Sequence, residues 1–239
     1  MTQNNKERDD ATRLAAHIQS TIISNVLTTK KWEAHIADCL RYRFHAAMVP
    51  GAWVRKTREA LQGSGVRTAS FVDFALGTMT SAGKACETAK LVEEGAEEVD
   101  LMPNLGFLLS GMEKEYFADI RGVVEAAGGM PVKIMLELPL LNDKQKERSI
   151  ALSVEAGAAY LKNASGSAVG GATPEQIRYL RGAAPAHVRV KASGGIKTAR
   201  QVRDLLEAGA ELVGTSSGVQ IVRDAMGESV AERAGNAAY

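Results

Sequence analysis

One helix-to-strand junction recurs three times in this sequence, as Glu94-Gly95-Ala96, as Glu155-Ala156-Gly157-Ala158 and as Glu207-Ala208-Gly209-Ala210. In each copy a glycine ends an amphipathic helical pattern, and an apolar run follows it. Glycine suits the left-handed position just beyond a helix because it has no Cβ to clash with the backbone. The repeat therefore indicates a chain built from repeated helix–strand units.

The rest of the chain shows the same alternation of short apolar runs and amphipathic stretches. The strands that we predict cover residues 18–23, 44–49, 66–72, 97–102, 132–137, 159–162, 188–192 and 212–215. Strands that alternate with helices form parallel sheets, and eight of them fit a closed (β/α)8 barrel, the TIM barrel. The length of 239 residues is close to the usual size of one such barrel. We expect an α/β fold with a polar N-terminal tail over residues 1–10 and a single barrel domain over residues 11–239.

Two of the predicted helices begin with a recognisable cap. Thr173-Pro174-Glu175-Gln176 and Thr198-Ala199-Arg200-Gln201 each place a threonine at the N-cap and a glutamine three residues later. This spacing predicts a capping box, in which the two side chains satisfy backbone N–H groups reciprocally.

The composition is that of an ordinary globular protein, with 45% hydrophobic and 24% charged residues. Lysine and arginine total 29 against 28 acidic residues, so the net charge of +1 gives no reason to expect nucleic acid or a charged membrane as a partner. The polar start of the chain argues against a secretory signal, and no apolar run is long enough to span a membrane. We expect a cytoplasmic protein.

The cysteines and histidines do not form a known metal or disulfide motif. Cys39 and Cys86 are far apart and neither belongs to a CxxC pair, and the four histidines show neither HxH nor HExxH spacing. We therefore predict no metal site, no cofactor and reduced thiols.

Three polar residues fall at or near the carboxyl ends of predicted strands. These residues are Asp100, Lys162 and Lys191. Counting five residues on from the junction glycines gives Asp100, Lys162 and Gly214, and Lys191 lies near the end of the run 188–192. In a (β/α)8 barrel this end carries the chemistry. One such lysine is more often a surface or ion-paired residue. Two lysines at one mouth disfavour each other's protonation, and a neutral amine can attack a carbonyl.

Glycine- and hydroxyl-rich loops follow the last two strands. Ser193-Gly194-Gly195-Ile196 follows the seventh strand, and Gly214-Thr215-Ser216-Ser217-Gly218 runs from the end of the eighth. Such loops let backbone N–H groups approach an anion, and this pair of loops is the frequent phosphate site of the barrel. Asn163-Ala164-Ser165-Gly166 could add donors. Tight turns also need glycine, so the adjacent pair is better evidence than either loop alone.

Several motifs occur together in a fixed order between about Ala15 and Val222. They are Phe74-Ala75-Leu76-Gly77, Gly95-Ala96-Glu97-Glu98-Val99-Asp100, Val132-Lys133-Ile134-Met135-Leu136-Glu137, Glu155-Ala156-Gly157-Ala158-Ala159-Tyr160-Leu161-Lys162, Gly170-Gly171-Ala172-Thr173, Val190-Lys191-Ala192-Ser193-Gly194-Gly195-Ile196 and Gly214-Thr215-Ser216-Ser217-Gly218. In this order they resemble the deoxyribose-phosphate aldolase family.

The resemblance implies a class I aldolase, a carbon–carbon lyase that cleaves 2-deoxy-D-ribose 5-phosphate reversibly to acetaldehyde and D-glyceraldehyde 3-phosphate. Lys162 matches the Schiff-base lysine, Lys191 the second lysine that tunes it, and Asp100 the acid/base aspartate. The positions that match the phosphate loops are Gly166, Gly194, Gly195, Gly214, Ser216 and Ser217. The resemblance also implies a small phosphorylated sugar or aldehyde as partner and a dimer or tetramer of identical chains.

Three segments depart from the pattern of the family. The run Asp-His-Thr on the first strand is Gln19-Ser20-Thr21 here, so Lys191 would deprotonate more readily or take another acid such as Glu137. The run Cys-Val-Asn-Pro on the second strand is Met48-Val49-Pro50-Gly51, and Thr-Ser-Thr-Gly after the nucleophile is Asn163-Ala164-Ser165-Gly166. All three lie in or near the expected active site, so they bear on the identity of the substrate.

Other functions remain open at this point. A divergent aldolase could act on a related sugar phosphate or a 3-hydroxy carbonyl compound. Another phosphate-binding barrel, such as an isomerase or an indole-type synthase, would use Asp100 and Glu137 as acid and base. A non-catalytic barrel could keep the phosphate loops and lack turnover.

Overall fold

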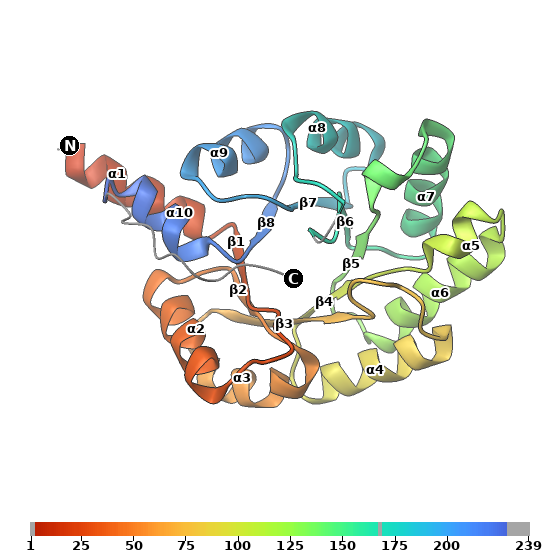
Figure 1. The fold of residues 1–239 in the computed structure, drawn as a ribbon, viewed down its shortest axis with the longest axis horizontal. Helices are drawn as coiled ribbons and strands as arrows, with labels where there is room; N and C mark the ends of the chain where they lie inside the picture. Colours follow the sequence, from red (N-terminus) through yellow and green to blue (C-terminus); the bar gives the residue numbers. More distant parts are fainter. Residues whose placement is uncertain (1–2, 167–168, 229–239) are drawn as a thin grey trace.

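Eight parallel strands form a closed barrel in the order β1 to β8, and helices surround it (Figure 1). The structure, a computed structural model, describes residues 3–166 and 169–228. The strands are β1 (Ile18–Thr21), β2 (Ala46–Met48), β3 (Arg67–Val72), β4 (Glu98–Leu101), β5 (Val132–Met135), β6 (Tyr160–Lys162), β7 (Arg189–Ser193) and β8 (Leu212–Thr215). The barrel and its eight predicted strands are therefore confirmed.

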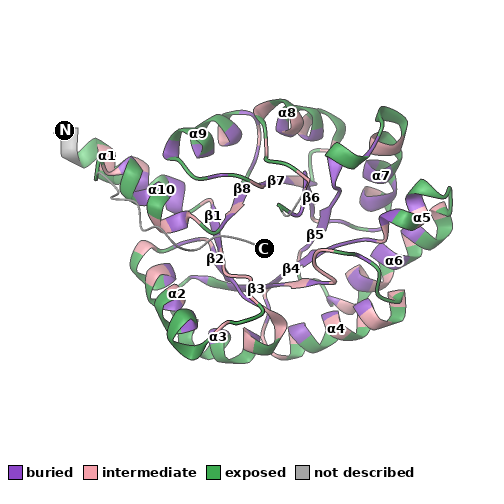
Figure 2. Cartoon of the chain, in the orientation of Figure 1, coloured by how far each residue is buried: buried purple, intermediate pink, exposed green. Residues whose placement is uncertain are grey.

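The helices follow the strands in turn and cover the outside of the barrel. They are α1 (Gln3–Ala15), α2 (Thr29–Tyr42), α3 (Val54–Leu61), α4 (Ser81–Glu93), α5 (Leu105–Leu109), α6 (Glu113–Ala126), α7 (Asp143–Glu155), α8 (Pro174–Ala183), α9 (Ala199–Glu207) and α10 (Gly218–Ala225), with short 3-10 turns η1 (Gly51–Trp53) and η2 (Leu138–Leu140). Figure 2 shows that these helices turn buried residues toward the strands and exposed residues outward.

The polar N-terminal segment is helical where the structure describes it. Residues 3–10 form the first part of α1, and α1 lies beside α10 (Figure 1). Ala11 and Leu14 are fully buried, and Arg203 Nε of α9 donates to Asp10 Oδ2 at 2.9 Å. These tertiary contacts hold a helix whose exposed face is polar. The predicted end of the domain at residue 239 lies outside the described residues.

The three repeated junctions all end their helices in the same way. Gly95, Gly157 and Gly209 have φ values of 102°, 99° and 107°. At the first junction, Ala96 N–H donates to Leu91 O at 2.9 Å and Gly95 N–H donates to Val92 O at 3.0 Å. The other two junctions repeat both bonds. This is the Schellman motif, which turns each helix directly into β4, β6 or β8.

The two predicted capping boxes have different outcomes. Thr198 and Gln201 form the box at α9, as predicted. Thr173 caps α8 by accepting from Gln176 N–H, but the Gln176 side chain accepts from Asn163 Nδ2 at 3.1 Å instead of closing the box. The prediction at α8 is therefore half wrong, because a tertiary contact takes the glutamine.

The inside of the barrel is charged near its mouth. Side chains two residues apart on a strand share a face, so Glu98 and Asp100 both point inward from β4. Lys133, Lys162 and Lys191 enter from β5, β6 and β7, and each is 4% exposed or less. A buried ion cluster therefore occupies the space where apolar side chains fill most barrels.

Within the described residues, no helix is long and apolar enough to cross a membrane. In the same part of the chain, no group of three or more histidine, cysteine or carboxylate side chains is placed to hold a metal ion.

Candidate active site

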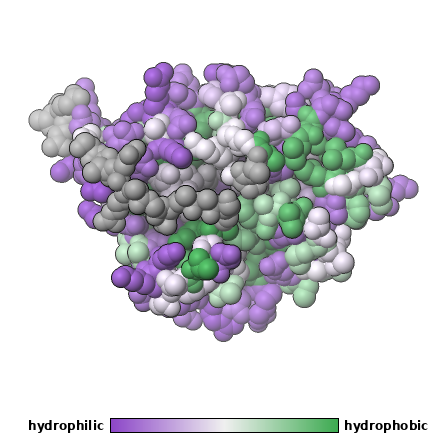
Figure 3. All heavy atoms as spheres, in the orientation of Figure 1, coloured by the Kyte–Doolittle hydropathy of each residue, from purple (hydrophilic) through white to green (hydrophobic). Residues whose placement is uncertain are grey.

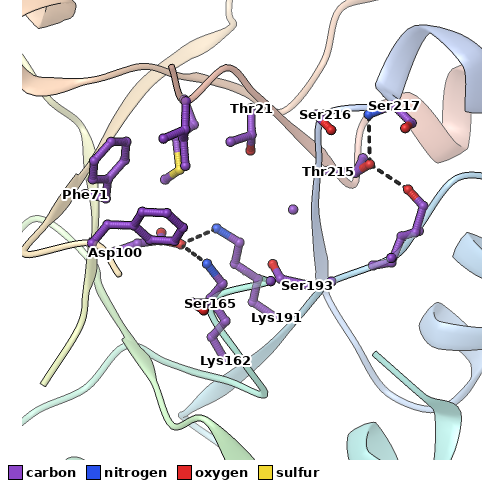
Figure 4. A pocket seen from close by; sticks show the side chains of 18 of the residues that line it. Thr21, Phe71, Asp100, Lys162, Ser165, Lys191, Ser193, Thr215, Ser216 and Ser217 are labelled. Atoms are coloured by element: carbon purple, nitrogen blue, oxygen red, sulfur yellow. Dashed lines mark hydrogen bonds and ion pairs between the residues drawn. The ribbon is translucent and has the colours of Figure 1, made fainter. Parts of the chain in front are cut away.

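A pocket opens at the carboxyl ends of the strands (Figure 4). Its volume is about 730 Å³, part of it open to solvent, which is a size typical of small-molecule sites. All nine predicted site residues line it: Asp100, Lys162, Gly166, Lys191, Gly194, Gly195, Gly214, Ser216 and Ser217. The structure therefore brings all nine residues together around one pocket.

Asp100 is the centre of the charged group. Lys162 Nζ donates to Asp100 Oδ2 at 3.0 Å, and Lys191 Nζ donates to the same oxygen at 2.6 Å (Figure 4). Because one carboxylate oxygen accepts both bonds, the two amines point toward each other in the pocket. This is the crowding of ammonium groups that the sequence predicted.

Lys191 has a second partner on β1. Its Nζ also donates to Gln19 Oε1, and Gln19 is fully buried. The suggestion that Glu137 replaces the missing strand-one aspartate is wrong. Glu137 accepts from the Ser165 N–H instead, and burial raises the pKa of its carboxyl group. The acid that Lys191 contacts is Asp100.

The ion cluster extends below the pocket through residues that the sequence analysis did not select. Lys133 Nζ lies 2.7 Å from Glu98 Oε2 and 3.3 Å from Asp100 Oδ1, and Glu98 Oε1 lies 2.7 Å from His45 Nε2. The strand alternation carried a signal for them. Glu98 shares the inward face of β4 with Asp100, and Lys133 pairs with Asp100 in the register of β4 and β5.

The cluster shifts the pKa values of Lys191, Asp100 and Glu98. Burial lowers the pKa of Lys191 well below its ordinary value, and the ammonium groups of Lys162 and Lys133 lower it further, against the opposing effect of Asp100. Burial acts to raise the pKa of Asp100, but the three lysines outweigh it and hold that pKa below its usual range. In the same way, Lys133 and His45 hold the pKa of Glu98 low. The cluster therefore favours the neutral amine at Lys191 and the ionised carboxylates at Asp100 and Glu98.

The loops after β6, β7 and β8 meet on one side of the pocket. Gly194 has a φ of 106°, and a Cβ there would lie 2.7 Å from the carbonyl oxygen of Gly170. Thr215 Oγ1 donates to Ile196 O at 2.7 Å and accepts from Ser217 N–H at 2.9 Å, which joins the last two loops (Figure 4). The glycine thus serves close backbone packing, and that packing brings the loops to one place.

On the side of the pocket formed by these loops, the structure adds one lining residue and gives Gly214 a second role. Lys197, which directly follows the glycine loop and was not selected from the sequence, is exposed and lines the pocket. Gly214 lies in β8, where a Cβ would be 2.5 Å from Ser193 Oγ and 3.0 Å from Lys191 Cε. Gly214 therefore leaves room for the Lys191 side chain as well as lining the pocket.

The opposite side of the pocket is apolar. Met48, Phe71 and Phe74 line it, and the rings of Phe71 and Phe74 are 5.3 Å apart. Figure 4 shows Phe71 on one side of the two lysines, with Ser216 and Ser217 on the other. The site thus combines an apolar wall, two adjacent amines and a group of backbone and hydroxyl donors.

Comparison with known proteins identifies the family. The model of the DeoC/LacD family aldolases matches residues 55–227. This chain belongs to the DeoC/LacD family of aldolases. This chain is 38% identical over 215 residues to the deoxyribose-phosphate aldolase of Bacillus subtilis (strain 168). The aligned region covers 90% of this chain and 92% of that protein. The aldolase is 36% identical over 211 residues to the enzyme of Clostridium botulinum (strain Langeland), covering 88% and 100% of the two chains.

A solved structure agrees. The deoxyribose phosphate aldolase from Aeropyrum pernix, described as having a unique tetrameric structure, superposes with a TM-score of 0.82 at 28% identity, covering 93% of this chain and 97% of that one. The resemblance seen in the sequence is confirmed, and the aldolase is a carbon–carbon lyase. The isomerase and synthase alternatives are not favoured.

The three departures from the family pattern fall at different depths in the aldolase. Met48 lines the pocket, and Gln19 contacts Lys191 beneath it. Asn163 is fully buried and holds β7: its Oδ1 accepts from Ser193 N–H at 2.8 Å and its Nδ2 donates to Ser193 O at 3.1 Å. The change at Asn163 therefore acts on the scaffold of the loops, whereas Met48 faces the substrate space.

Proposed function

We propose that this aldolase cleaves 2-deoxy-D-ribose 5-phosphate reversibly into acetaldehyde and D-glyceraldehyde 3-phosphate. The observation that carries the proposal is the meeting of Lys162 and Lys191 at one oxygen of Asp100, beside loops suited to a phosphate. The names of the relatives support this substrate.

Lys162 is the nucleophile in this proposal. It ends β6 and is 4% exposed, whereas Lys191 is 1% exposed and held by both Asp100 and Gln19. Lys162 is thus the better placed of the two to approach a carbonyl group in the pocket. Its neutral amine attacks the C1 aldehyde to give a carbinolamine, which loses water to form a protonated imine.

The imine then serves as the electron sink. The C3 hydroxyl loses its proton, the C2–C3 bond breaks, and its electron pair moves toward the iminium nitrogen to form an enamine, which releases D-glyceraldehyde 3-phosphate. Protonation of the enamine at C2 and addition of water release acetaldehyde and restore the Lys162 amine. Atoms and charge balance with one water taken up after one is lost.

Lys191 accepts and returns protons in these steps, because burial and the neighbouring ammonium groups lower its pKa and so favour its neutral amine. Asp100 stays ionised, since the surrounding lysines hold its pKa low. It therefore stabilises the cationic imine at Lys162 through its charge and accepts hydrogen bonds from both nitrogens. In this proposal the acid/base work expected of Asp100 is done by Lys191.

The phosphate lies against Gly166, Gly194, Gly195, Ser216 and Ser217. Glycine backbones leave N–H groups accessible, and α10 starts at Gly218 with its positive end at the pocket. Binding at this distance from the reacting carbon positions C1 at Lys162.

The aldolase also forms a homo-oligomer in this proposal. Leu140 of η2 is 55% exposed and Leu109 of α5 is 49% exposed, and Figure 3 shows apolar side chains gathered over these two segments. The tetrameric relative from Aeropyrum pernix supports self-association. Light scattering on the purified protein should give a mass above 25.4 kDa, and a monomer at all concentrations would contradict it.

Borohydride trapping tests the reaction. Reduction in the presence of 2-deoxy-D-ribose 5-phosphate or acetaldehyde should fix a covalent adduct on Lys162, located by peptide mass spectrometry. The variant Lys162→Leu should fold and form no adduct at this position. An adduct of equal yield in that variant would overturn the assignment. A panel of other phosphorylated and free 2-deoxy sugars and 3-hydroxy aldehydes separates this substrate from those of a divergent aldolase, and binding without turnover across the panel would indicate a non-catalytic barrel.

A further inference from the structure

A second buried ion pair lies behind the apolar wall of the pocket. Lys84 of α4 and Asp119 of α6 are both fully buried, and Lys84 Nζ lies 2.7 Å from Asp119 Oδ2. Neither residue is among those that line the pocket. The catalytic steps described above do not use this pair.

Ser81 Oγ of α4 donates to Asp119 Oδ1 at 2.8 Å, and further contacts of the pair reach two loops at the mouth of the barrel. Lys84 Nζ donates to Gly77 O and to Met102 O, both at 3.1 Å. Asp119 Oδ2 accepts from Asn104 N–H at 2.9 Å. Gly77 belongs to the segment after β3, and Met102 and Asn104 belong to the segment after β4. The ion pair therefore links the segment after β3 to the segment after β4 through hydrogen bonds to their backbones.

The segment after β3 is closely packed against the segment after β4. Asp73 Oδ2 accepts from Met79 N–H at 2.7 Å and lies 3.5 Å from Lys84 Nζ. Gly77 has a φ of 72°, and a Cβ there would be 2.3 Å from Pro103 O. Phe74 lies within this segment, so its place is set by the same contacts.

Phe74 completes the apolar wall. Its ring packs against Phe71, and both line the pocket with Met48. The phosphate-suited loops lie across the lysines from Phe71 (Figure 4). When the phosphate end of a substrate points toward Ser216 and Ser217, substituents on the two-carbon unit that point away from these loops meet the apolar wall. The wall is therefore placed to limit the size of that unit.

We propose that Lys84 and Asp119 are positioning residues that hold Phe74 in the wall and so restrict the carbonyl compound on Lys162 to a short aldehyde. This inference rests on the proposed function, because it requires an imine at Lys162. A buried ion pair often adds little net stability compared with apolar residues, whereas its directional bonds fix geometry. Here the bonds fix the backbone that carries Phe74.

The experiment compares imine formation with acetaldehyde and with butanal. Borohydride trapping on Lys162 measures both, and their ratio reports the size limit. The variant Phe74→Ala opens the wall directly, so the preference for acetaldehyde should fall by about tenfold or more, the effect of one to two methylene groups in an apolar pocket. The double variant Lys84→Met/Asp119→Asn removes both charges together and should lower the preference in the same direction, by about threefold or more.

The control variant is Thr57→Val, which removes a buried hydrogen bond from Trp32 Nε1 at 2.8 Å between α2 and α3, away from the pocket. It should lower the melting temperature and leave the preference unchanged. If the double variant does not fold, Asp119→Asn alone provides the same comparison. An unchanged preference in the folded ion-pair variant, or in Phe74→Ala, would overturn the proposal. Absence of any adduct in the unmodified protein would instead refute the proposed function.

Discussion

Lys191 and Asp100 form the shorter of two ion pairs that share one carboxylate oxygen, at 2.6 Å against 3.0 Å for Lys162 and Asp100. The closer contact belongs to the lysine that is more deeply buried and whose pKa is lowered. The two amines therefore differ: Asp100 holds Lys191 closely, whereas Lys162 is more open to the pocket. This asymmetry leads to the predictions below.

Replacing Lys191 by Met should slow turnover by about 10²–10⁴-fold, the usual contribution of a proton-transfer group. The neutral form of Lys191 increases as pH rises through its lowered pKa. The acidic limb of the kcat/KM profile that reflects this titration should therefore disappear in Lys191→Met. The measurement is kcat/KM from about pH 5 to about pH 9. An identical profile shape in the variant would show that another group titrates.

Replacing Gln19 by Glu should move the same acidic limb to higher pH. Gln19 now offers Lys191 a neutral oxygen, and a carboxylate at that place would favour the ammonium form and raise the pKa of Lys191. The expected shift is about one pH unit or more. Gln19→Met is the matched control, because it adds no charge. A shift of equal size and direction in both variants would mean that charge is not the cause.

The buried cluster should make stability sensitive to acid. The pKa values of Asp100 and Glu98 are both below their ordinary range, so the unfolded chain takes up protons at higher pH than the folded chain does. The stabilisation is thus fully present above about pH 5 and is lost as pH falls below about 4. Thermal unfolding between pH 7 and pH 2 (roughly, the range over which carboxyl groups titrate) measures this loss.

A double variant isolates the contribution of the lower part of the cluster. Glu98→Gln/Lys133→Met removes one carboxylate and one ammonium together, so the net charge of the cluster does not change. Its melting temperature should fall less on acidification than that of the unmodified protein. An equal or steeper fall would show that other carboxyl groups control the acid transition.

Replacing Gly194 by Ala should impair substrates that carry a phosphate more than those that do not. The new Cβ would lie 2.7 Å from Gly170 O, so the loops after β6 and β7 would have to separate. We expect KM for 2-deoxy-D-ribose 5-phosphate to rise by about tenfold or more, equivalent to about 1.4 kcal/mol of binding, with a smaller effect on free 2-deoxy-D-ribose. Gly63→Ala is the control, since Gly63 has a φ of 74° and open space around it. Equal effects on both sugars would argue against a phosphate site here.

Local patterns were sufficient to predict most of the fold. The junction glycines and the alternation of apolar runs gave all eight strands, because both signals are short-range. The helix over residues 3–10 was not predicted, because their composition is polar and the helix depends on contacts that Asp10 and its neighbours make with α9 and α10. A single sequence does not show such contacts.

The site was predictable where a residue lies at or near the carboxyl end of a predicted strand, as with Asp100, Lys162 and Lys191. Glu98 and Lys133 lie near the starts of β4 and β5, so a pattern of residues at strand ends does not include them, although two-residue alternation and strand register place them on the inner face with Asp100. The contact between Gln19 and Lys191 was not predictable, because it depends on the closing of the barrel, in which Gln19 pairs with Gly214 across β1 and β8. The ion pair between Lys84 and Asp119 was likewise not predictable, because it joins two helices that are far apart in sequence.

The absence of a side chain at Gly214 has a consequence for the evolution of this enzyme. Even a methyl group at that position would collide with Ser193 Oγ and with the stem of Lys191. In a saturation library of β8, position 214 should tolerate no replacement that keeps activity, while Thr215 could still exchange for serine. Selection at this codon would then preserve the space that the side chains of Lys191 and Ser193 occupy inside the barrel.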